Sequence, residues 1–172
     1  MGCGSINTQP QILLLGLDGA GKTTFLYSNK WDYFEPTMGF NYEEIKLRSI
    51  VKASVWDVSG KSTLRCLWPT IYKNIQIKAV IFVIDANKSD RFLEARKELL
   101  FLVNEEELRE CCFLIVFNFK GSCKLGLDEM GSKVGVDLVH QMVKIKTVLI
   151  DLMEDDVESS DGVLWLCEQL DR

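Results

Sequence analysis

The sequence predicts an α/β fold, in which a mostly parallel, six-stranded sheet carries helices on both faces. The chain has six predicted strands, most of them apolar, and apart from one hairpin they alternate with stretches that have helical periodicity. A glycine-rich loop directly follows the first run, the arrangement of a strand–loop–helix phosphate site. The length of 172 residues, with 47% hydrophobic and 26% charged residues, fits one such domain with a full core. We expect its ligand at the carboxyl ends of the strands.

The first strand (12–15) leads through this loop into a helix from residue 22 to about residue 30. Glycines let the loop curl, so that its N–H groups and the helix N-terminus converge on phosphate oxygens. We expect Lys22 on the β- and γ-phosphates and the Thr23 hydroxyl on Mg²⁺. A glycine-rich turn without a ligand is the alternative interpretation. The candidate nucleotide contacts in this loop are Asp18, Gly19, Ala20, Gly21, Lys22, Thr23 and Thr24.

An aromatic-rich loop (31–40) comes next and contains Thr37, either a second hydroxyl ligand of Mg²⁺ or a turn residue. Two strands (40–47 and 51–58) then form an antiparallel hairpin. The second ends close to Asp57, which suits water-mediated Mg²⁺ binding, and the Gly60 N–H suits a contact to the γ-phosphate.

The remaining elements alternate between helices and strands. A short helix (63–72) should be kinked or shortened by Pro69, and a helix that starts at Ser89 or Asp90 should run to about residue 104. A weaker helical pattern covers residues 129–143. The other predicted strands are 79–84, 113–117 and 147–152, and a closing helix carries Val163, Leu166, Cys167 and Leu170.

Composition excludes several functional classes. A net charge of −5 and a pI near 5.0 argue against nucleic-acid binding. No apolar run approaches the roughly 18 residues that span a bilayer, so we expect a soluble, cytoplasmic protein. The six cysteines form no Cys-x-x-Cys pair and His140 stands alone, which makes zinc improbable. Cys111, Cys112 and Cys167 lie in apolar patterns and are predicted to pack.

Residues 1–10 form an N-terminal segment ahead of the domain predicted over residues 11–172. Gly2 followed by Cys3 is the arrangement that N-myristoylation and palmitoylation use, although Ile6 stands where Ser or Thr is usual. A plain disordered start is the alternative. If both residues are acylated, they would supply the two signals that stable peripheral membrane attachment needs.

Taken together, these residues resemble the Arf and Arf-like branch of the small GTPases. The likeness runs from residue 12 to residue 170 and is most specific in the phosphate loop (16–24), in Pro36-Thr37-Met38-Gly39-Phe40-Asn41 and in Trp56-Asp57-Val58. Residues 94–99 and 107–109 also look like the third helix of that branch and its exit.

The resemblance implies a small-GTPase fold and a guanine-nucleotide switch that binds GTP or GDP with Mg²⁺. It implies Lys22 on the phosphates, Gly60 on the γ-phosphate, and effector proteins that bind the switch regions. The Mg²⁺ ligands would be Thr23, Thr37 and Asp57; the residues toward the base would be Asn118 and Lys120. The effector surface would be Phe40, Trp56 and Ile71, where Ile71 replaces the usual tyrosine.

The departures from this family are concentrated at the base and at the hydrolytic position. Lys61 stands where the family has the glutamine that orients the attacking water, and a lysine has no acceptor for that water, so no catalytic residue is assigned. Asn118-Phe119-Lys120-Gly121 replaces Asn-Lys-x-Asp, so the carboxylate that reads guanine is missing. The last loop (152–155) lacks the usual small residues.

Three functions remain open on the sequence. The leading one is an Arf-like GTP-binding switch or trafficking-type regulator with weak or absent hydrolysis. The first alternative is a pseudo-GTPase that serves as a structural subunit. The second is a phosphate-loop ATPase or nucleotide kinase, against which no further catalytic base or lid is apparent.

Overall fold

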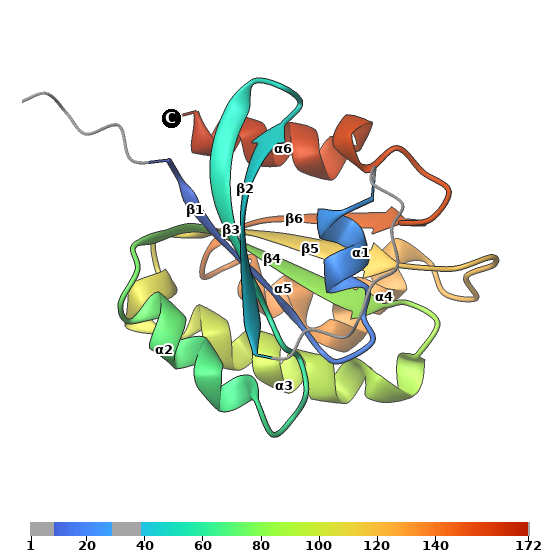
Figure 1. Ribbon diagram of the computed structural model, residues 1–172. Coiled ribbons are helices and arrows are strands. Elements are labelled where there is room, and N and C mark those ends of the chain that lie inside the picture. The colour runs from blue at the N-terminus through green and yellow to red at the C-terminus, as the bar shows by residue number, and fades with distance from the viewer. Residues whose placement is uncertain (1–8, 29–38, 172) are drawn as a thin grey trace, which may run out of the picture.

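The computed structural model describes residues 9–28 and 39–171, in which the six predicted strands form one sheet (Figure 1). The strand order is β2-β3-β1-β4-β5-β6, with β2 antiparallel to β3 and every other neighbouring pair parallel. The predicted six-stranded α/β architecture is therefore confirmed. The strands are β1 (Gln11–Gly16), β2 (Phe40–Leu47), β3 (Val51–Val58), β4 (Ile77–Asp85), β5 (Cys112–Asn118) and β6 (Lys144–Ile150).

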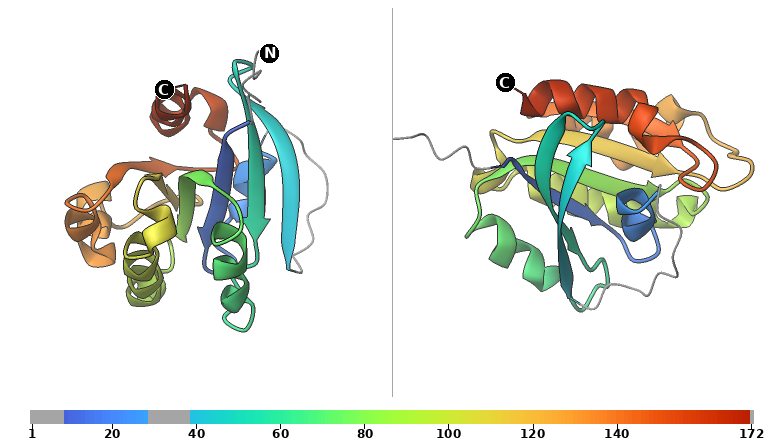
Figure 2. Two further views of the ribbon diagram at one scale, coloured as in Figure 1. Left: turned by 90° about the vertical axis from the view of Figure 1, so that its left-hand side faces the viewer. Right: turned by 45° about the horizontal axis from the view of Figure 1, so that its top comes forward.

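Helices cover both faces of the sheet because successive strand residues point to opposite sides. Leu13 and Leu15 of β1 belong to a core cluster with α2, α3, α4 and α5, whereas Ile12 and Leu14 pack in a second cluster with α1 and α6. Figure 2 shows the red α6 on one side of the sheet and the green α2 and α3 on the other. The helices are α1 (Lys22–Leu26), α2 (Trp68–Tyr72), α3 (Phe92–Val103), α4 (Leu127–Val134), α5 (Val136–Val139) and α6 (Asp161–Leu170).

Two of the helical patterns form shorter helices than they span, and each has a local cause. The helix expected over 63–72 is shortened at Pro69, one of the two outcomes predicted: Pro69 lies in the first turn of α2, where its missing N–H has no helical partner to lose, so α2 begins at Trp68. The weak helical pattern over 129–143 forms two helices, because Gly135 adopts a left-handed conformation (φ 81°) between α4 and α5.

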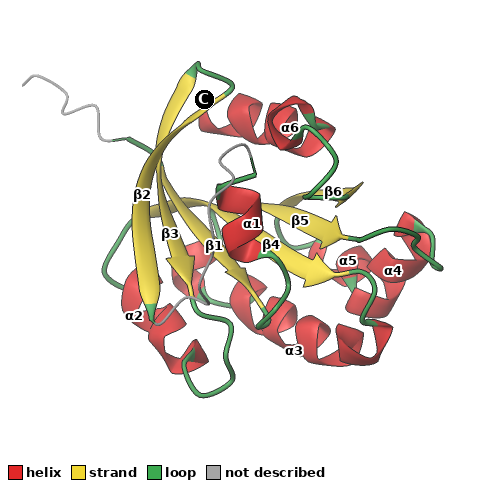
Figure 3. Ribbon diagram, turned by 45° about the vertical axis from the view of Figure 1, so that its right-hand side comes forward, coloured by secondary structure: helices red, strands yellow, loops and turns green. Residues whose placement is uncertain are grey.

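The parallel strands bring their carboxyl ends to one edge of the sheet. The arrowheads of β4, β5 and β6 point to the same side of the molecule (Figure 3). The pairing of β1 with β3 sets Leu14 opposite Asp57, which places this aspartate beside the loop that follows β1. Within residues 9–28 and 39–171, no helix has the length and apolarity to cross a membrane.

The cysteines of the described chain divide into buried and accessible thiols. Cys111 and Cys112 are buried, as predicted, and burial raises the pKa of Cys111 to about 12 and that of Cys112 to about 11. Cys167 is partly buried against the α6 side of the core. Cys66 is exposed in the 3₁₀ turn Arg65–Leu67.

Candidate nucleotide-binding site

The phosphate loop curls around Lys22, the first residue of α1. The Lys22 ammonium donates hydrogen bonds to the Gly16 carbonyl at 3.2 Å and to the Leu17 carbonyl at 2.9 Å, and only 7% of the residue is exposed. Burial lowers the pKa of Lys22 to about 8, against the opposing charges of Asp57 and Asp18. Gly21, immediately before α1, adopts a left-handed backbone conformation (φ 101°) that connects the loop to the helix.

Thr23 and Asp57 meet across the site from α1 and β3. The Thr23 hydroxyl donates to Asp57 Oδ2 at 2.9 Å, and Asp57 is fully buried. Hydroxyl and carboxylate oxygens are the hard ligands that Mg²⁺ takes, so this pair fits the metal role predicted for it. Thr37, the third predicted Mg²⁺ ligand, lies outside the described residues.

Gly60 packs directly against the phosphate loop. A Cβ at this position would lie 2.2 Å from the Gly16 oxygen and 2.6 Å from the Asp18 nitrogen, both main-chain atoms. Only glycine therefore fits here, and the contact brings the residue predicted to touch the γ-phosphate next to the loop that would hold it.

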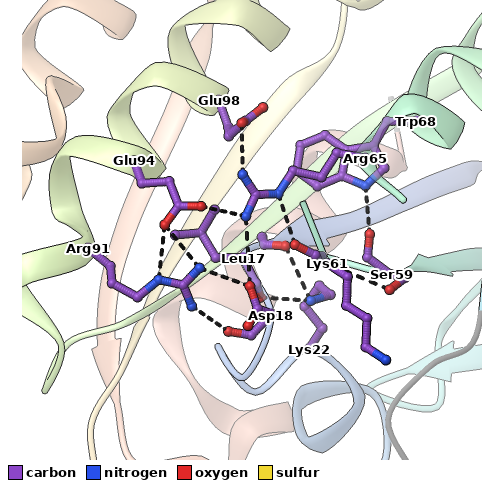
Figure 4. Close-up of polar contacts among 12 residues, drawn as sticks. Leu17, Asp18, Lys22, Ser59, Lys61, Arg65, Trp68, Arg91, Glu94 and Glu98 are labelled. Carbon is purple, nitrogen blue, oxygen red and sulfur yellow. Dashed lines mark hydrogen bonds and ion pairs between the residues drawn. The ribbon is translucent and has the colours of Figure 1, made fainter. Parts of the chain in front are cut away.

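Lys61, at the position of the hydrolytic glutamine, is exposed. Its side chain extends away from the cluster around Arg65 (Figure 4), and its main-chain N–H donates to Ser59 Oγ at 3.5 Å. A lysine at this position supplies no hydrogen-bond acceptor for water.

An ion-pair network that was not predicted from the sequence joins the phosphate loop to α3. Arg91 donates to the Asp18 carboxylate at 2.8 Å and to Glu94 at 3.0 Å. Arg65 donates to Glu94 at 2.7 Å and to Glu98 at 2.9 Å, and its Nη2 lies 3.7 Å from Asp18 Oδ1 (Figure 4). The Arg91 hydrogen bond lowers the pKa of Asp18, and the Arg65 hydrogen bond lowers that of Glu94, so both carboxyls are held ionised.

At the base end, Asn118 is the residue that reaches the phosphate loop. Its amide donates to the Ala20 carbonyl at 3.1 Å, and its Oδ1 accepts from the Leu152 N–H at 3.4 Å. A Cβ at Gly21 would lie 2.5 Å from the same amide nitrogen, so the Asn118 side chain packs directly against Gly21. Asn118 thus ties the loops after β1, β5 and β6 together.

The residues that follow Asn118 do not provide a base-reading carboxylate. Phe119 is partly buried against the core, and Lys120 is exposed, with its N–H held by the Asn87 side chain at 2.8 Å. Gly121 has φ 70°, and nothing lies within 4 Å of the place a Cβ would take. The phosphate end therefore fits a nucleotide and Mg²⁺, whereas position 121 offers a guanine ring no acceptor.

Comparison with known proteins identifies the family to which this chain belongs. The model of the ADP-ribosylation factor (Arf) family matches residues 3–170. The chain belongs to the Arf family. Among solved structures, it superposes with a TM-score of 0.84 on the small GTPase Arl6 BBS3 from Trypanosoma brucei, determined with the bound nucleotide analogue GppNp. The two chains are 25% identical, over 96% of this chain and 99% of that one. Arf-family GTPases bind guanine nucleotide and Mg²⁺, and they bind effectors.

The three residues predicted to bind effectors differ in their exposure to solvent. Phe40 is 52% exposed, and its ring lies 5.7 Å from that of Trp56. Ile71, by contrast, is buried in the core, because it lies on the side of α2 that packs against the sheet. Tyr42, 45% exposed and 4.9 Å from the Trp56 ring, stands in the aromatic patch instead.

Proposed function

We propose that this chain is an Arf-like GTP-binding protein with weak or absent intrinsic hydrolysis, which acts as a switch or trafficking-type regulator by binding partners. One observation carries the proposal: Thr23 of α1 and Asp57 of β3 are in hydrogen-bond contact, beside Lys22, which is buried at the start of α1. A lysine, a hydroxyl and a carboxylate brought together at a helix N-terminus suit a magnesium triphosphate.

Each residue of the phosphate end has a distinct part in binding. The Lys22 ammonium would exchange its hydrogen bonds to loop carbonyls for phosphate oxygens, and main-chain N–H groups of residues 19–24 would line the phosphates. Thr23 and, through water, Asp57 would hold Mg²⁺, together with Thr37. The metal would neutralise charge on the β- and γ-phosphates when bound.

Slow hydrolysis follows from the chemistry of Lys61. The family glutamine accepts a hydrogen bond from the attacking water, and an ammonium cannot do so. Its positive charge would stabilise the bound triphosphate as well as a transition state, which leaves the barrier little changed. Bound triphosphate is therefore expected to persist.

The base end supports a relaxed choice of base and also the alternative function. Because Gly121 has no side chain, adenine and guanine nucleotides would share the same phosphate contacts and differ mainly at Asn118 and Lys120. A pseudo-GTPase that serves as a structural subunit is the second candidate, and the missing carboxylate at position 121 is the observation that favours it.

Partner binding and membrane attachment complete the proposal. Phe40 and Tyr42, both exposed, pack on the half-buried Trp56 and form an aromatic surface suited to an effector. Acylation of Gly2 and Cys3 would attach the protein peripherally to a membrane from the cytoplasm. Intact-mass measurement on protein from its native source tests acylation, and an unmodified N-terminus contradicts it.

Titration with a fluorescent GTP analogue and Mg²⁺ tests nucleotide binding. Lys22→Ala should remove binding, whereas Lys133→Ala, an exposed lysine paired with Glu129 on α4, should leave it unchanged. Equal binding by wild type and Lys22→Ala would show that the phosphate loop is not the site. Wild-type protein that binds no nucleotide, with or without Mg²⁺, would favour the pseudo-GTPase.

A further inference from the structure

Gly60 is linked by two peptide groups to its neighbours, and a different side chain holds each one. The Trp68 indole N–H donates to the Ser59 carbonyl at 3.0 Å, which belongs to the peptide group that contains the Gly60 N–H. Arg65 Nε donates to the Gly60 carbonyl at 2.9 Å, which belongs to the next peptide group. The orientations of both peptide groups at Gly60 are therefore fixed by side-chain donors from the segment 65–72, which consists of the 3₁₀ turn Arg65–Leu67 and α2.

The Trp68 contact determines where the Gly60 N–H points. In a trans peptide the carbonyl and the N–H point in opposite directions, so an oxygen drawn toward Trp68 turns the Gly60 N–H away from it. Trp68 is itself buried in the core cluster that includes α2 and α3. The core therefore holds the Trp68 indole in place, and the Gly60 N–H is oriented without a ligand.

Arg65 is equally constrained. Its side chain is 11% exposed, and its guanidinium engages Glu94 and Glu98 at 2.7 and 2.9 Å while Nε holds Gly60 (Figure 4). A planar guanidinium with three directed partners has one orientation that satisfies them all. Helix α3 therefore holds the Gly60 carbonyl in place through Arg65.

We propose that Arg65 and Trp68 are positioning residues that preset the Gly60 N–H for a γ-phosphate and so set the preference of the site for triphosphate over diphosphate. This inference rests on the proposed nucleotide site. A donor already fixed in place loses little entropy when the ligand arrives, so its hydrogen bond contributes more fully to affinity. Only a ligand with a γ-phosphate gains from it.

The test compares the dissociation constants of GppNHp and GDP, both with Mg²⁺, for wild type and two variants. Trp68→Phe removes the indole donor and keeps an aromatic ring. Arg65→Lys keeps the positive charge but loses the planar guanidinium that bonds Gly60, Glu94 and Glu98 together. Each should weaken GppNHp binding by roughly tenfold and change GDP binding by less than about twofold. Trp165→Phe makes the same substitution on α6, where Trp165 is partly buried against the other core cluster, and should change neither constant.

The GDP constant separates a positioning role from a general loss of structure. If Trp68→Phe and Arg65→Lys weaken both ligands alike, or weaken neither, the inference is overturned while the proposed nucleotide site stands. If wild type binds neither GppNHp nor GDP, the proposed function fails and this inference fails with it. A fall confined to GppNHp in folded variants supports the inference.

Discussion

The two ends of the site are built differently. At the phosphate end, Lys22, Thr23, Asp57 and Gly60 are within contact of one another or of the same loop, and most are buried. At the base end, Gly121 faces open space and Lys120 is exposed. The phosphate end has the residues typical of the Arf family, and the base end departs from them.

The residues for phosphate binding and the residues for base recognition therefore come from separate parts of the fold. The phosphate end is assembled from β1, α1 and β3, whereas the base end comes from the loops after β5 and β6. Asn118 links them through its bonds to Ala20 and Leu152. A carboxylate can therefore be absent at position 121 while the phosphate end stays assembled.

Alanine at a glycine of each end should show the contrast most strongly. Gly60→Ala drives a Cβ into main-chain atoms of the phosphate loop and should lower the free energy of unfolding by about 3 kcal/mol. Gly121→Ala meets no atom and should cost only about 1 kcal/mol, from its left-handed backbone. Urea denaturation measures both. Equal losses in the free energy of unfolding would show that the two ends of the site tolerate an added side chain equally well, contrary to the difference described above.

The buried ammonium should also make the phosphate end respond to pH. The pKa of Lys22 is lowered to about 8 from an ordinary 10.5, so between these values the unfolded chain binds a proton that the folded protein does not. Raising the pH across this window should stabilise wild type relative to Lys22→Met, by up to about 3 kcal/mol. Denaturation of both proteins from pH 7.5 to 10.5 measures the difference. A flat difference would show that the folded protein keeps this lysine charged.

Restoring a carboxylate should move the base end toward the family. Gly121→Asp is compatible with the left-handed backbone better than most substitutions, and it supplies an acceptor for guanine. We expect the ratio of GTP to ATP affinity to rise by roughly 10²-fold, as two hydrogen bonds to a charged group allow. Competition of GTP, ATP and inosine triphosphate against one labelled ligand measures it. Wild type that already prefers GTP by roughly 10⁴ would indicate that another residue reads guanine.

The smallest expected effect concerns hydrolysis. Lys61→Gln supplies the missing acceptor without touching the buried contacts of Lys22, and it should speed single-turnover hydrolysis by about tenfold or more. Lys61→Ala removes the charge without adding an acceptor and should stay slow. Wild-type hydrolysis as fast as that of Lys61→Gln would contradict the proposed role of Lys61.

The parts of the fold that local sequence determines were predictable. The hairpin strands begin and end at the predicted residues, because β-branched and aromatic residues flank a short polar turn. The phosphate loop was equally clear, since glycine spacing, Lys22 and Thr23 are adjacent in the chain.

What depends on contacts across the chain was not predictable. Asp18 and Arg91 are 73 residues apart, and no spacing rule links them to Arg65. The burial of Ile71 depends on which side of a short helix faces the sheet, and a five-residue helix has too little periodicity to show this. Phe119 packs on the core for a similar reason, since only the folded loop brings it there.

The exposed thiol of Cys66 has a practical consequence. It lies beside Arg65 and two residues before Trp68, while burial raises the pKa values of Cys111 and Cys112 and shields them from electrophiles. In a Cys3→Ser chain, a maleimide fluorophore should therefore couple preferentially at Cys66. Such a dye would report in real time on the segment 65–72, which holds Gly60 in place, as different nucleotides are mixed with the protein.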